Sequence, residues 1–409
     1  MVMMYQKSKT GNGTDKTLLV VNSGSSSLKL SLFSSALICI FDAHLKFGDN
    51  GITSLETSLA DTATTLDTNN DIEEALKATF DLLKKEYQFT LPPLHAIGHR
   101  VVHGGTEFSS ITKITGDVLE RLKAVTHLAP LHNPACLKGI QGCLKYFGKE
   151  IEQFAIFDTA FHTTMPAIAY TYAIPMHLSA KYSIRRFGFH GIAHAFLWDL
   201  FAQTHSPEAK VITCHLGNGC SCAAISAGRS LDTSMGFTPT EGLCMATRSG
   251  DIDPGIFEFL AFHENISPKE VLNILNTQSG LFGISELSQH MGTLISHYES
   301  DPKAALAVDL FCYRAQKYIG AYLPVLQGID AIIFSGGIGE NAPLIRKRII
   351  EKFSWFGVEM DDEQNHKAVR PPKGQLLKIS TPNSKIGVYV ATADENLYIA
   401  KEVLQNCNL

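Results

Sequence analysis

The chain carries one local device twice: an apolar run, a turn of small residues and a second apolar run. In the first copy, residues 17–22 and 28–33 flank the turn Ser23-Gly24-Ser25-Ser26-Ser27. In the second copy, residues 211–215 and 221–225 flank the turn Leu216-Gly217-Asn218-Gly219. Short apolar runs around glycine and serine turns are typical of β-hairpins. Two hairpins of one kind indicate an internal duplication.

A third glycine-rich segment, Gly336-Gly337-Ile338-Gly339, follows the apolar run 331–335 and precedes a helix that we expect to begin near Asn341. Glycine turns let several backbone N–H groups point inward at one anion, and a helix N-terminus adds to this effect. Three such turns, with Lys29 close to the first, favour binding of a polyphosphate. The Walker pattern is absent, and the first two turns lead into strands, which argues against a Rossmann site.

The spacing of apolar residues predicts further elements. Helices are expected at residues 71–87, 116–125, from Asn133 onward and at 302–326, and strands at 94–99 and 151–157. Asn70 and Glu73 form a candidate capping box for the first of these helices. Residues 30–41 carry no charge, but they are too few to cross a bilayer and are predicted as a strand. The helix at 302–326 would suit either a domain core or a dimer face.

Composition excludes several classes of protein. With 409 residues, 45% hydrophobic side chains and a formal net charge of −5, the chain is long enough for two or three domains with real cores. The slight excess of acidic over basic residues gives no sign of a basic surface that would bind nucleic acid or a membrane. Residues 1–16 are expected to be a disordered extension without a signal peptide, which predicts a cytosolic protein. Nine scattered cysteines fit reduced thiols, and Cys220 and Cys222 near His215 suit packing better than a zinc site.

Four segments are unusually dense in polar groups within apolar surroundings: residues 98–105, 157–162, 185–191 and 247–253. Buried charges are costly unless they are paired or used. One interpretation is that Arg100 pairs with Asp158, or Arg248 with Asp251, to hold the domains together. The other is a phosphoryl-transfer centre, in which arginine and histidine neutralise the transferred group and Asp158 helps to hold magnesium.

These segments carry a family resemblance that extends from about Thr17 to the C-terminus. The sequence resembles the acetokinase family, within the superfamily of actin, heat-shock chaperones and sugar kinases. The motifs that carry the resemblance are residues 22–29 (NSGSSSLK), 99–105 (HRVVHGG), 129–134 (APLHNP), 157–162 (FDTAFH), 188–191 (GFHG), 215–219 (HLGNG), 247–254 (TRSGDIDP) and 336–341 (GGIGEN).

The resemblance implies an α/β fold of the duplicated βββαβαβα type (actin-like ATPase, ribonuclease H-like), with two domains closing around a cleft. Residues 17–157 plus 393–409 would form the N-terminal domain, and residues 158–392 the nucleotide-binding domain. It further implies a homodimer and the Mg²⁺-dependent, reversible transfer of the γ-phosphoryl group of ATP to acetate.

The resemblance also implies roles for individual residues. The catalytic set would be Arg100, His132, Asp158, His190 and Arg248, and the acetate methyl group would sit in an apolar pocket of Val102, Leu131, Phe189 and Pro239. The nucleotide would contact Asn22, Ser25, Ser27, Lys29, His215, Leu216, Gly217, Asn218, Gly219, His290, Gly292, Gly336, Gly337, Ile338, Gly339, Glu340 and Asn341. Magnesium would be held by Asn22, Asp158 and Glu395, with Mn²⁺ as a substitute.

The chemistry of the acceptor agrees with this assignment. A carboxylate is already ionised at neutral pH, so cations and a metal suffice and no general base is required. If Asp158 were a general base, a hydroxyl acceptor would be favoured instead. Propionate or another short acyl group, or a phosphoryl donor other than ATP, are the alternatives within the family. A non-catalytic nucleotide-binding module would not need Arg100, Asp158, His190 and Arg248 together, so the presence of all four argues against it.

The sequence departs from the family pattern at two places. The family usually carries Ser-x-Asp-x-Arg near the adenosine, whereas this chain has His290 and Gly292 at the two charged positions. We therefore expect weaker or less selective nucleotide binding. Near the C-terminus the family has two consecutive Glu residues, and this chain has Glu395 followed by Asn396. We assign the metal role to Glu395 rather than to Asp394.

Overall fold

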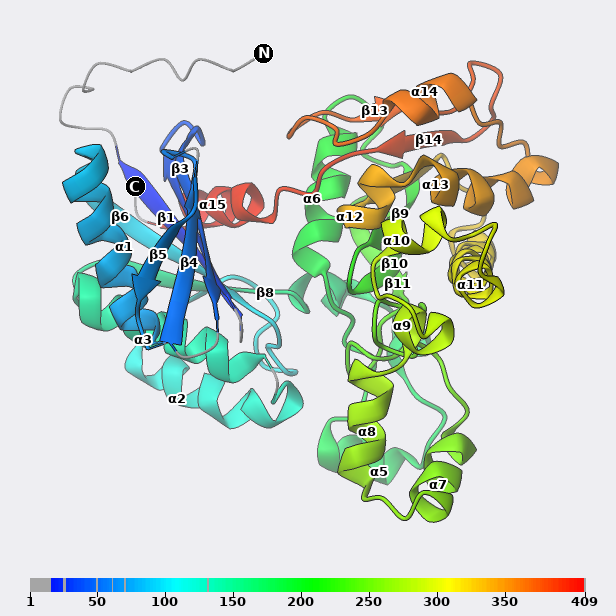
Figure 1. Cartoon of the computed structure of the whole chain (residues 1–409), viewed down its shortest axis with the longest axis horizontal. Coiled ribbons are helices and arrows are strands. Elements are labelled where there is room, and N and C mark those ends of the chain that lie inside the picture. Colours follow the sequence, from blue (N-terminus) through cyan, green and yellow to red (C-terminus); the bar gives the residue numbers. More distant parts are fainter. Residues whose placement is uncertain are drawn as a thin grey trace. The chain divides into compact units, whose positions relative to one another are not determined.

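The computed structural model describes residues 16–24, 27–48, 51–60, 62–69, 71–130 and 132–407. They form two compact units, shown in Figure 1. Unit 1 comprises the described residues of 1–104, 110–157 and 396–409, and unit 2 comprises residues 105–109 and 158–395. Among these residues, no helix is long and apolar enough to cross a membrane.

Unit 1 is built on one mixed sheet with the strand order β5-β4-β3-β2-β1-β6-β8-β7. Its strands are β1 (Thr17–Ser23), β2 (Ser27–Ser34), β3 (Cys39–Phe47), β4 (Ile52–Thr57), β5 (Thr64–Asp67), β6 (Leu94–Val101), β7 (Thr112–Lys113) and β8 (Glu152–Phe157). Strands β1, β2 and β3 pair antiparallel, and β6 and β8 continue the sheet parallel to β1.

Helices cover both faces of the unit 1 sheet. On one face, α1 (Ile72–Tyr87) and α3 (Asn133–Phe147) contribute Leu76, Phe80 and Cys143 to a buried apolar cluster with the strands. On the other face lies α15 (Glu395–Asn406), which approaches β6 at Gly98. A methyl group on Gly98 would lie 2.7 Å from Cγ2 of Ile399, so the close approach requires glycine. The shorter α2 (Gly116–Ala124) precedes α3.

Unit 2 repeats the same core topology with the strand order β11-β10-β9-β12-β14-β13. Its strands are β9 (Lys210–Leu216), β10 (Cys220–Ser226), β11 (Arg229–Thr233), β12 (Ala331–Ser335), β13 (Leu377–Lys378) and β14 (Gly387–Val390). Three antiparallel strands are again followed by two strands parallel to the first. The predicted α/β class and the internal duplication are confirmed.

The register of unit 2 assigns each face of its sheet to one helix. His194 on α6 (Gly191–Ala202) bonds Thr213 on β9 and Ser221 on β10, so α6 covers this face. Alternate residues point to the other face. There α11 (Pro302–Leu326) packs against the strands and buries nine side chains, including Phe311 and Tyr322. The helix at 302–326 therefore belongs mainly to the core.

The covering helices α6 and α15 are exchanged between the two halves of the chain. The helix α6 comes after β8, the last parallel strand of unit 1, yet it packs in unit 2. The helix α15 comes after β14, the last parallel strand of unit 2, yet it packs on β6 of unit 1. Each unit is thus completed by a helix that follows the other unit's sheet.

Further helices belong to unit 2. They are α4 (Ala167–Tyr170), α5 (Met176–Tyr182), α7 (Pro254–His263), α8 (Pro268–Thr277), α9 (Gly280–Ser285), α10 (Met291–Ser296), α12 (Gly336–Asn341), α13 (Pro343–Ile350) and α14 (Asp362–Lys367). Single 3₁₀ segments occur at Val125–Leu128, Ala160–Thr164 and Glu351–Phe356.

Three local predictions were wrong in detail. The predicted strand at residues 30–41 contains the end of β2 and the start of β3, because residues 34–38 form a turn. The helix expected near Asn341 begins at Gly336, since the Glu340 carboxylate accepts a hydrogen bond from the Gly336 N–H (2.9 Å). The helix α1 is capped by Asp71, whose side chain accepts from the Glu74 N–H, while Asn70 lies outside the described residues.

Candidate active site

In unit 2, polar side chains gather on the sheet face that α6 covers. Thr213 and His215 of β9, Ser221 of β10 and Ser335 of β12 all point to this face because they share one register. His215 Nδ1 lies 2.9 Å from Ser335 Oγ, which links the two parallel strands. The apolar strands thus place a row of hydroxyl and imidazole groups at one edge of an otherwise buried sheet.

His190 lies at the N-cap of α6 in the left-handed backbone region, with φ = 56°. Its Nδ1 is 2.9 Å from Ser221 Oγ, and the next residue, Gly191, donates its N–H to the carbonyl oxygen of Asp158 (2.8 Å). A methyl group on Gly191 would lie 2.2 Å from that oxygen. Side chain and backbone are therefore both fixed, and Asp158 is brought close to the start of α6.

The β9–β10 turn brings three predicted site residues together. A methyl group on Gly219 would lie 3.3 Å from His190 Nε2 and 3.5 Å from Arg248 Nη1, so only glycine leaves this space open. Arg248 Nη1 also donates to the carbonyl oxygen of Pro239 (3.2 Å). The turn is tied to the segment of Arg248 by a hydrogen bond from the Ala246 N–H to the Asn218 carbonyl oxygen (3.1 Å).

The second and third glycine segments are neighbours. A methyl group on Gly217 would lie 3.7 Å from the backbone nitrogen of Gly337. Gly336 has φ = +76°, and a methyl group there would lie 2.7 Å from the carbonyl oxygen of Leu216. The structure thus places the segments 215–219 and 336–341 side by side, as a shared phosphate site would require.

Buried imidazoles support this arrangement. Burial lowers the pKa of His162 to about 4, so the ring is neutral at pH 7. Its Nε2 lies 3.0 Å from the carbonyl oxygen of Phe189, which can only accept, so Nε2 donates and Nδ1 accepts from Ser230 Oγ. Burial also lowers the pKa of His194 well below its usual value. The neutral ring of His162 therefore holds the backbone of Phe189, and the neutral ring of His194 holds His190 through Ser221.

The cationic side chain of Arg248 is half-buried, and among the described residues it hydrogen-bonds only neutral groups, the Pro239 carbonyl oxygen and the Met245 sulfur. Burial lowers the pKa of Arg248. The sequence left open a pairing of Arg248 with Asp251. The structure instead has Asp251 accept from the Gly242 N–H and the Tyr318 hydroxyl (2.9 and 2.8 Å).

In unit 1 the predicted residues lie at the ends of β1, β2 and β6. Arg100 Nη1 donates to Asn22 Oδ1 (3.3 Å), and Lys29 pairs with Asn22 in the strand register. His132 is the N-cap residue of α3, and Val102, half-buried, follows β6. Ser27 begins β2. Ser25 and Leu131 lie outside the described residues.

The remaining predicted residues lie at the start of α10 and around the start of α15. His290 is the N-cap residue of α10, and both His290 and Gly292 are exposed. Glu395 is half-buried, whereas its neighbour Asp394 is buried and forms an ion pair with Lys373 (3.2 Å). Asn396 donates to Ser31 Oγ (2.7 Å).

Cys220 and Cys222, which were predicted to pack as thiols near His215, lie on β10. Cys222 Sγ lies 3.4 Å from Cys214 Sγ, and Cys220 Sγ lies 3.2 Å from the carbonyl oxygen of Gly217. Burial raises the pKa of Cys220, which keeps it a thiol.

Within the described ranges, no three side chains of His, Cys, Asp or Glu gather as metal ligands. A magnesium ion bound largely by substrate phosphates needs only one or two protein carboxylates, and the predicted donors are all oxygen.

The sequence analysis missed several residues that hold the site. Ser221 and His194 position His190, and Tyr172 and Glu241 bond to each other beside Arg186. Arg186 lay inside a segment already noted for its polar density. For the others no local signal exists, because their partners are 19 to 69 residues away in the chain.

A duplicated α/β scaffold with glycine turns, an arginine and fixed imidazoles defines a phosphoryl-transfer enzyme. Solved structures agree with this class. An acetate kinase from Porphyromonas gingivalis is similar with a TM-score of 0.86 and 33% identity, covering 95% of this chain and 99% of that chain. A propionate kinase from Francisella tularensis subsp. tularensis has a TM-score of 0.86 and 38% identity, covering 95% and 98%.

Sequence comparisons give the family. The family model described as the acetokinase family matches residues 17–401. An acetate kinase of Solibacter usitatus is 42% identical over 407 residues, which cover 95% of this chain and 97% of that protein. One of Halothermothrix orenii is 43% identical over 396 residues, covering 94% and 98%. The chain belongs to the acetokinase family. It is a phosphotransferase with a carboxyl group as acceptor, and its function is that of an acetate kinase using ATP and ADP.

Proposed function

We propose that this chain transfers the γ-phosphoryl group of ATP reversibly to acetate, in one direct in-line step that depends on Mg²⁺, giving acetyl phosphate and ADP. The observation that carries the proposal is that His190 Nε2 and Arg248 Nη1 both lie within 3.5 Å of the position that a methyl group on Gly219 would take. A group with developing negative charge at that position would meet a cation and an imidazole that are already in place.

The residues act by binding and by neutralising charge. Arg248 cannot lose its proton in a protein and is held by neutral partners, so its charge remains available to the transferred phosphoryl group. Arg100, which Asn22 orients in unit 1, supplies the second cation for the acetate carboxylate. His190 and His132 donate to oxygens of the substrates. Because acetate is already ionised, Asp158 is not needed as a base.

The nucleotide phosphates are assigned to the glycine segments. Backbone N–H groups of residues 217–219 and 336–337 would bind them, with Asn22, Ser25, Ser27 and Lys29 at the terminal phosphate and magnesium end. The adjacency of Gly217 and Gly337 supports this assignment. We likewise propose residues 158–392 as the nucleotide-binding domain, since both segments lie within that range.

Asp158, Glu395 and the amide oxygen of Asn22 would hold the magnesium ion. All three offer hard oxygen donors, which suits Mg²⁺ (or Mn²⁺) and does not suit zinc. When bound, the ion neutralises phosphate charge and aligns the β- and γ-phosphoryl groups. Asp158 is buried and its carbonyl oxygen is bonded to Gly191, so its position is fixed before substrates bind.

Phe189 and Pro239, with Val102 and Leu131, would line the pocket for the acetate methyl group. His162 fixes the backbone of Phe189, and Arg248 bonds the carbonyl oxygen of Pro239, so both walls are held. One extra methylene changes selectivity in such pockets by only about 10- to 200-fold. Propionate is therefore the second candidate acceptor, which the similarity to the Francisella propionate kinase also supports.

We further propose a homodimer in the cytosol. The helix α7 has no buried residue although it is rich in apolar side chains, and Phe259 and Phe262 are 57% and 80% exposed. A second helix of unit 2, α5, also exposes an apolar side chain, Met176, which is 66% exposed. An apolar face of this kind suits a second copy of the chain better than water. The cytosolic assignment is supported by nine free cysteines.

The activity is tested by trapping acyl phosphate with hydroxylamine. Purified protein is incubated with ATP, magnesium and acetate, propionate or glycerol. We expect acyl hydroxamate with acetate, less with propionate, and loss of the product when EDTA removes the metal. Absence of hydroxamate together with ADP formation from glycerol would show a hydroxyl acceptor and overturn the proposal.

A further inference from the structure

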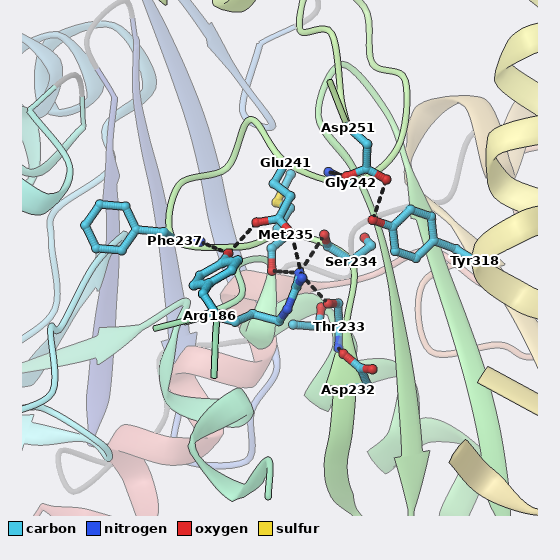
Figure 2. A network of polar contacts seen from close by, with 11 residues as sticks. Arg186, Asp232, Thr233, Ser234, Met235, Phe237, Glu241, Gly242, Asp251 and Tyr318 are labelled. Carbon is cyan, nitrogen blue, oxygen red and sulfur yellow. Dashed lines mark hydrogen bonds and ion pairs between the residues drawn. The ribbon is translucent and has the colours of Figure 1, made fainter. Parts of the chain in front are cut away.

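Three side chains from distant parts of unit 2 form a closed polar cluster, of which Figure 2 labels Arg186 and Glu241. We name Tyr172, Arg186 and Glu241 the Arg186 cluster. Arg186 Nη2 bonds Glu241 Oε1 (2.5 Å), and the Tyr172 hydroxyl donates to Glu241 Oε2. The Tyr172 oxygen also accepts from the Phe237 N–H (2.8 Å). The cluster is thus a continuous chain of hydrogen bonds that ends on the backbone.

The charges in the cluster are fixed by their surroundings. Burial opposes the charge of Arg186, but the carboxylate of Glu241 and other nearby groups outweigh it and raise its pKa. Burial and the Glu241 carboxylate raise the pKa of Tyr172, so its hydroxyl keeps its proton. The phenol must therefore donate to Glu241 and accept from Phe237, which gives the cluster a single arrangement.

The cluster joins two stretches of backbone. Arg186 Nη1 lies 3.0 to 3.1 Å from the carbonyl oxygens of Thr233, Ser234 and Met235. The N–H groups of Phe187 and Gly188 both donate to the carbonyl oxygen of Gly236 (3.1 and 3.3 Å). One stretch continues directly to Phe189 and His190. The other continues to Pro239 and Arg248.

The second stretch, residues 234–253, has no helix or strand, so it lacks a regular ladder of hydrogen bonds. The Arg186 cluster holds its beginning, and Asp251 holds its end by bonding the Gly242 N–H and the Tyr318 hydroxyl (Figure 2). The cluster has no free space beside Gly236. A methyl group on Gly236 would lie 1.6 Å from Glu241 Oε2 and 2.2 Å from the Tyr172 hydroxyl oxygen.

We propose that the Arg186 cluster is a positioning device that sets the discrimination between acetate and larger carboxylates. It does so by fixing Pro239 and Arg248 relative to Phe189 and His190. This inference rests on the proposed function, since it assumes that Phe189 and Pro239 line the acyl pocket. None of the three side chains needs to touch a substrate. A pocket wall that is less firmly held excludes an additional methylene group less well, because such exclusion depends on close packing.

The chain offers a matched control. Tyr298, Asp309 and Arg348 form a second, more exposed triad of a tyrosine, a carboxylate and an arginine, in which the Tyr298 hydroxyl donates to Asp309 (3.1 Å) and accepts from Arg348 Nη1 (2.7 Å). This triad joins α11 and α13 and bonds nothing in residues 233–251. Tyr172→Phe and Tyr298→Phe therefore each remove a tyrosine hydroxyl that bonds a carboxylate beside an arginine, and only the first releases the acyl-pocket segment.

The experiment compares kcat and KM for acetate, propionate and ATP in wild type and both variants. We expect Tyr172→Phe to raise KM for acetate by about five- to tenfold and to lower the acetate-to-propionate ratio of kcat/KM by a similar factor, with KM for ATP unchanged. Tyr298→Phe should leave all these values within about twofold, and thermal melting shows whether both variants are folded. If Tyr172→Phe does not fold, Glu241→Gln, which keeps the shape of the side chain, replaces it.

An acceptor ratio in Tyr172→Phe equal to that in Tyr298→Phe would overturn the inference, as would an equal loss of kcat with every acceptor. If wild type forms acyl phosphate but Tyr172→Phe leaves the acetate-to-propionate ratio of kcat/KM unchanged, only the positioning role is contradicted. Wild type that forms no acyl phosphate would remove the proposed function, and the positioning role with it.

Discussion

The two units solve the same structural problem with different side chains. In each unit, a side-chain hydrogen bond links the first core strand to the fourth near their ends. These strands are β1 and β6 in unit 1, on the sheet face that α15 covers, and β9 and β12 in unit 2, on the face that α6 covers. In unit 1 the bond joins Arg100 and Asn22, and in unit 2 it joins His215 and Ser335. The duplicated scaffold therefore offers the same position twice. A guanidinium and an amide occupy it in one unit, and an imidazole and a hydroxyl occupy it in the other.

The two units differ more in the connection between their third and fourth core strands, which are β3 and β6 in unit 1 and β11 and β12 in unit 2. In unit 1 this connection adds β4, β5 and α1, which widen the sheet and extend the apolar cluster. In unit 2 it adds the irregular segment 234–253 and helices α7 to α11. Arg248 lies in that irregular segment. The comparison teaches that the repeated sheet carries the glycine turns and Arg100, whereas the unequal insertion of unit 2 adds a further cation, Arg248.

Removing the cation of the unit 2 insertion is expected to have the largest effect. Arg248→Ala should lower kcat/KM for acetate by about 10³-fold, or about 4 kcal/mol, because the transferred group loses a preorganised positive charge. Steady-state kinetics with acetate and ATP measure the loss. Arg229→Ala, at an exposed arginine on β11, is the control for the change in net charge and should be near wild type. Retention of more than a tenth of the activity by Arg248→Ala would contradict the assignment.

The buried histidine of unit 1 should make stability depend on pH. Burial lowers the pKa of His99 to about 4 in the folded state, against an ordinary value of 6.5. The unfolded chain therefore binds the proton more tightly, and stability present above pH 6.5 is lost as the pH falls toward 4. The loss amounts to about 3 kcal/mol.

Urea unfolding of wild type and His99→Gln at pH 7.5 and 4.5 measures this contribution. The variant lacks the titrating group, so its free energy of unfolding should fall less between the two pH values. Parallel pH dependences for the two proteins would show that His99 does not contribute in this way.

The C-terminal carboxylates should differ from each other. Glu395→Ala should lower kcat by about 10²-fold and raise the magnesium concentration needed for half-maximal rate, since a proposed metal ligand is lost. Asp394→Ala should do little, because Asp394 pairs with Lys373. Magnesium titrations of the steady-state rate compare the two variants. The opposite pattern would place the metal role on Asp394.

The smallest expected effect concerns the nucleotide. His290→Asp combined with Gly292→Arg restores the charges that the family usually carries, and a Cβ atom on Gly292 would meet no other atom within 4 Å. We expect KM for ATP to fall by about tenfold and preference for adenine over guanine to rise. Kinetics with ATP and GTP test this. Unchanged affinity and base preference would show that these positions do not govern nucleotide binding.

Local sequence patterns predicted most of the scaffold. The strand at 331–335 and the helix at 302–326 match the structure, and the hairpin strands match within one residue at each end, because periodicity and turn residues act over short distances. The start of α12 was misplaced because the Glu340 side chain, four residues ahead, stabilises its first turn. No propensity rule contains that contact.

The candidate site was only partly predictable. Arg248, His190 and the glycine turns stood out as motifs, whereas Tyr172 and Glu241 did not. Those two residues are 69 positions apart, and Glu241 is 55 positions from Arg186. Their contact depends on how the irregular segment 234–253 is folded, which no repeating pattern encodes. Supporting residues of a site are therefore found only from the structure.

The configuration at phosphorus tests the central claim most directly. ATP made chiral at the γ-phosphorus with oxygen isotopes is converted with acetate, and the configuration of the transferred group is determined. A single in-line transfer between bound substrates predicts inversion. Retention would require two displacements through a phosphorylated side chain, and would contradict an active site that acts by positioning and charge alone.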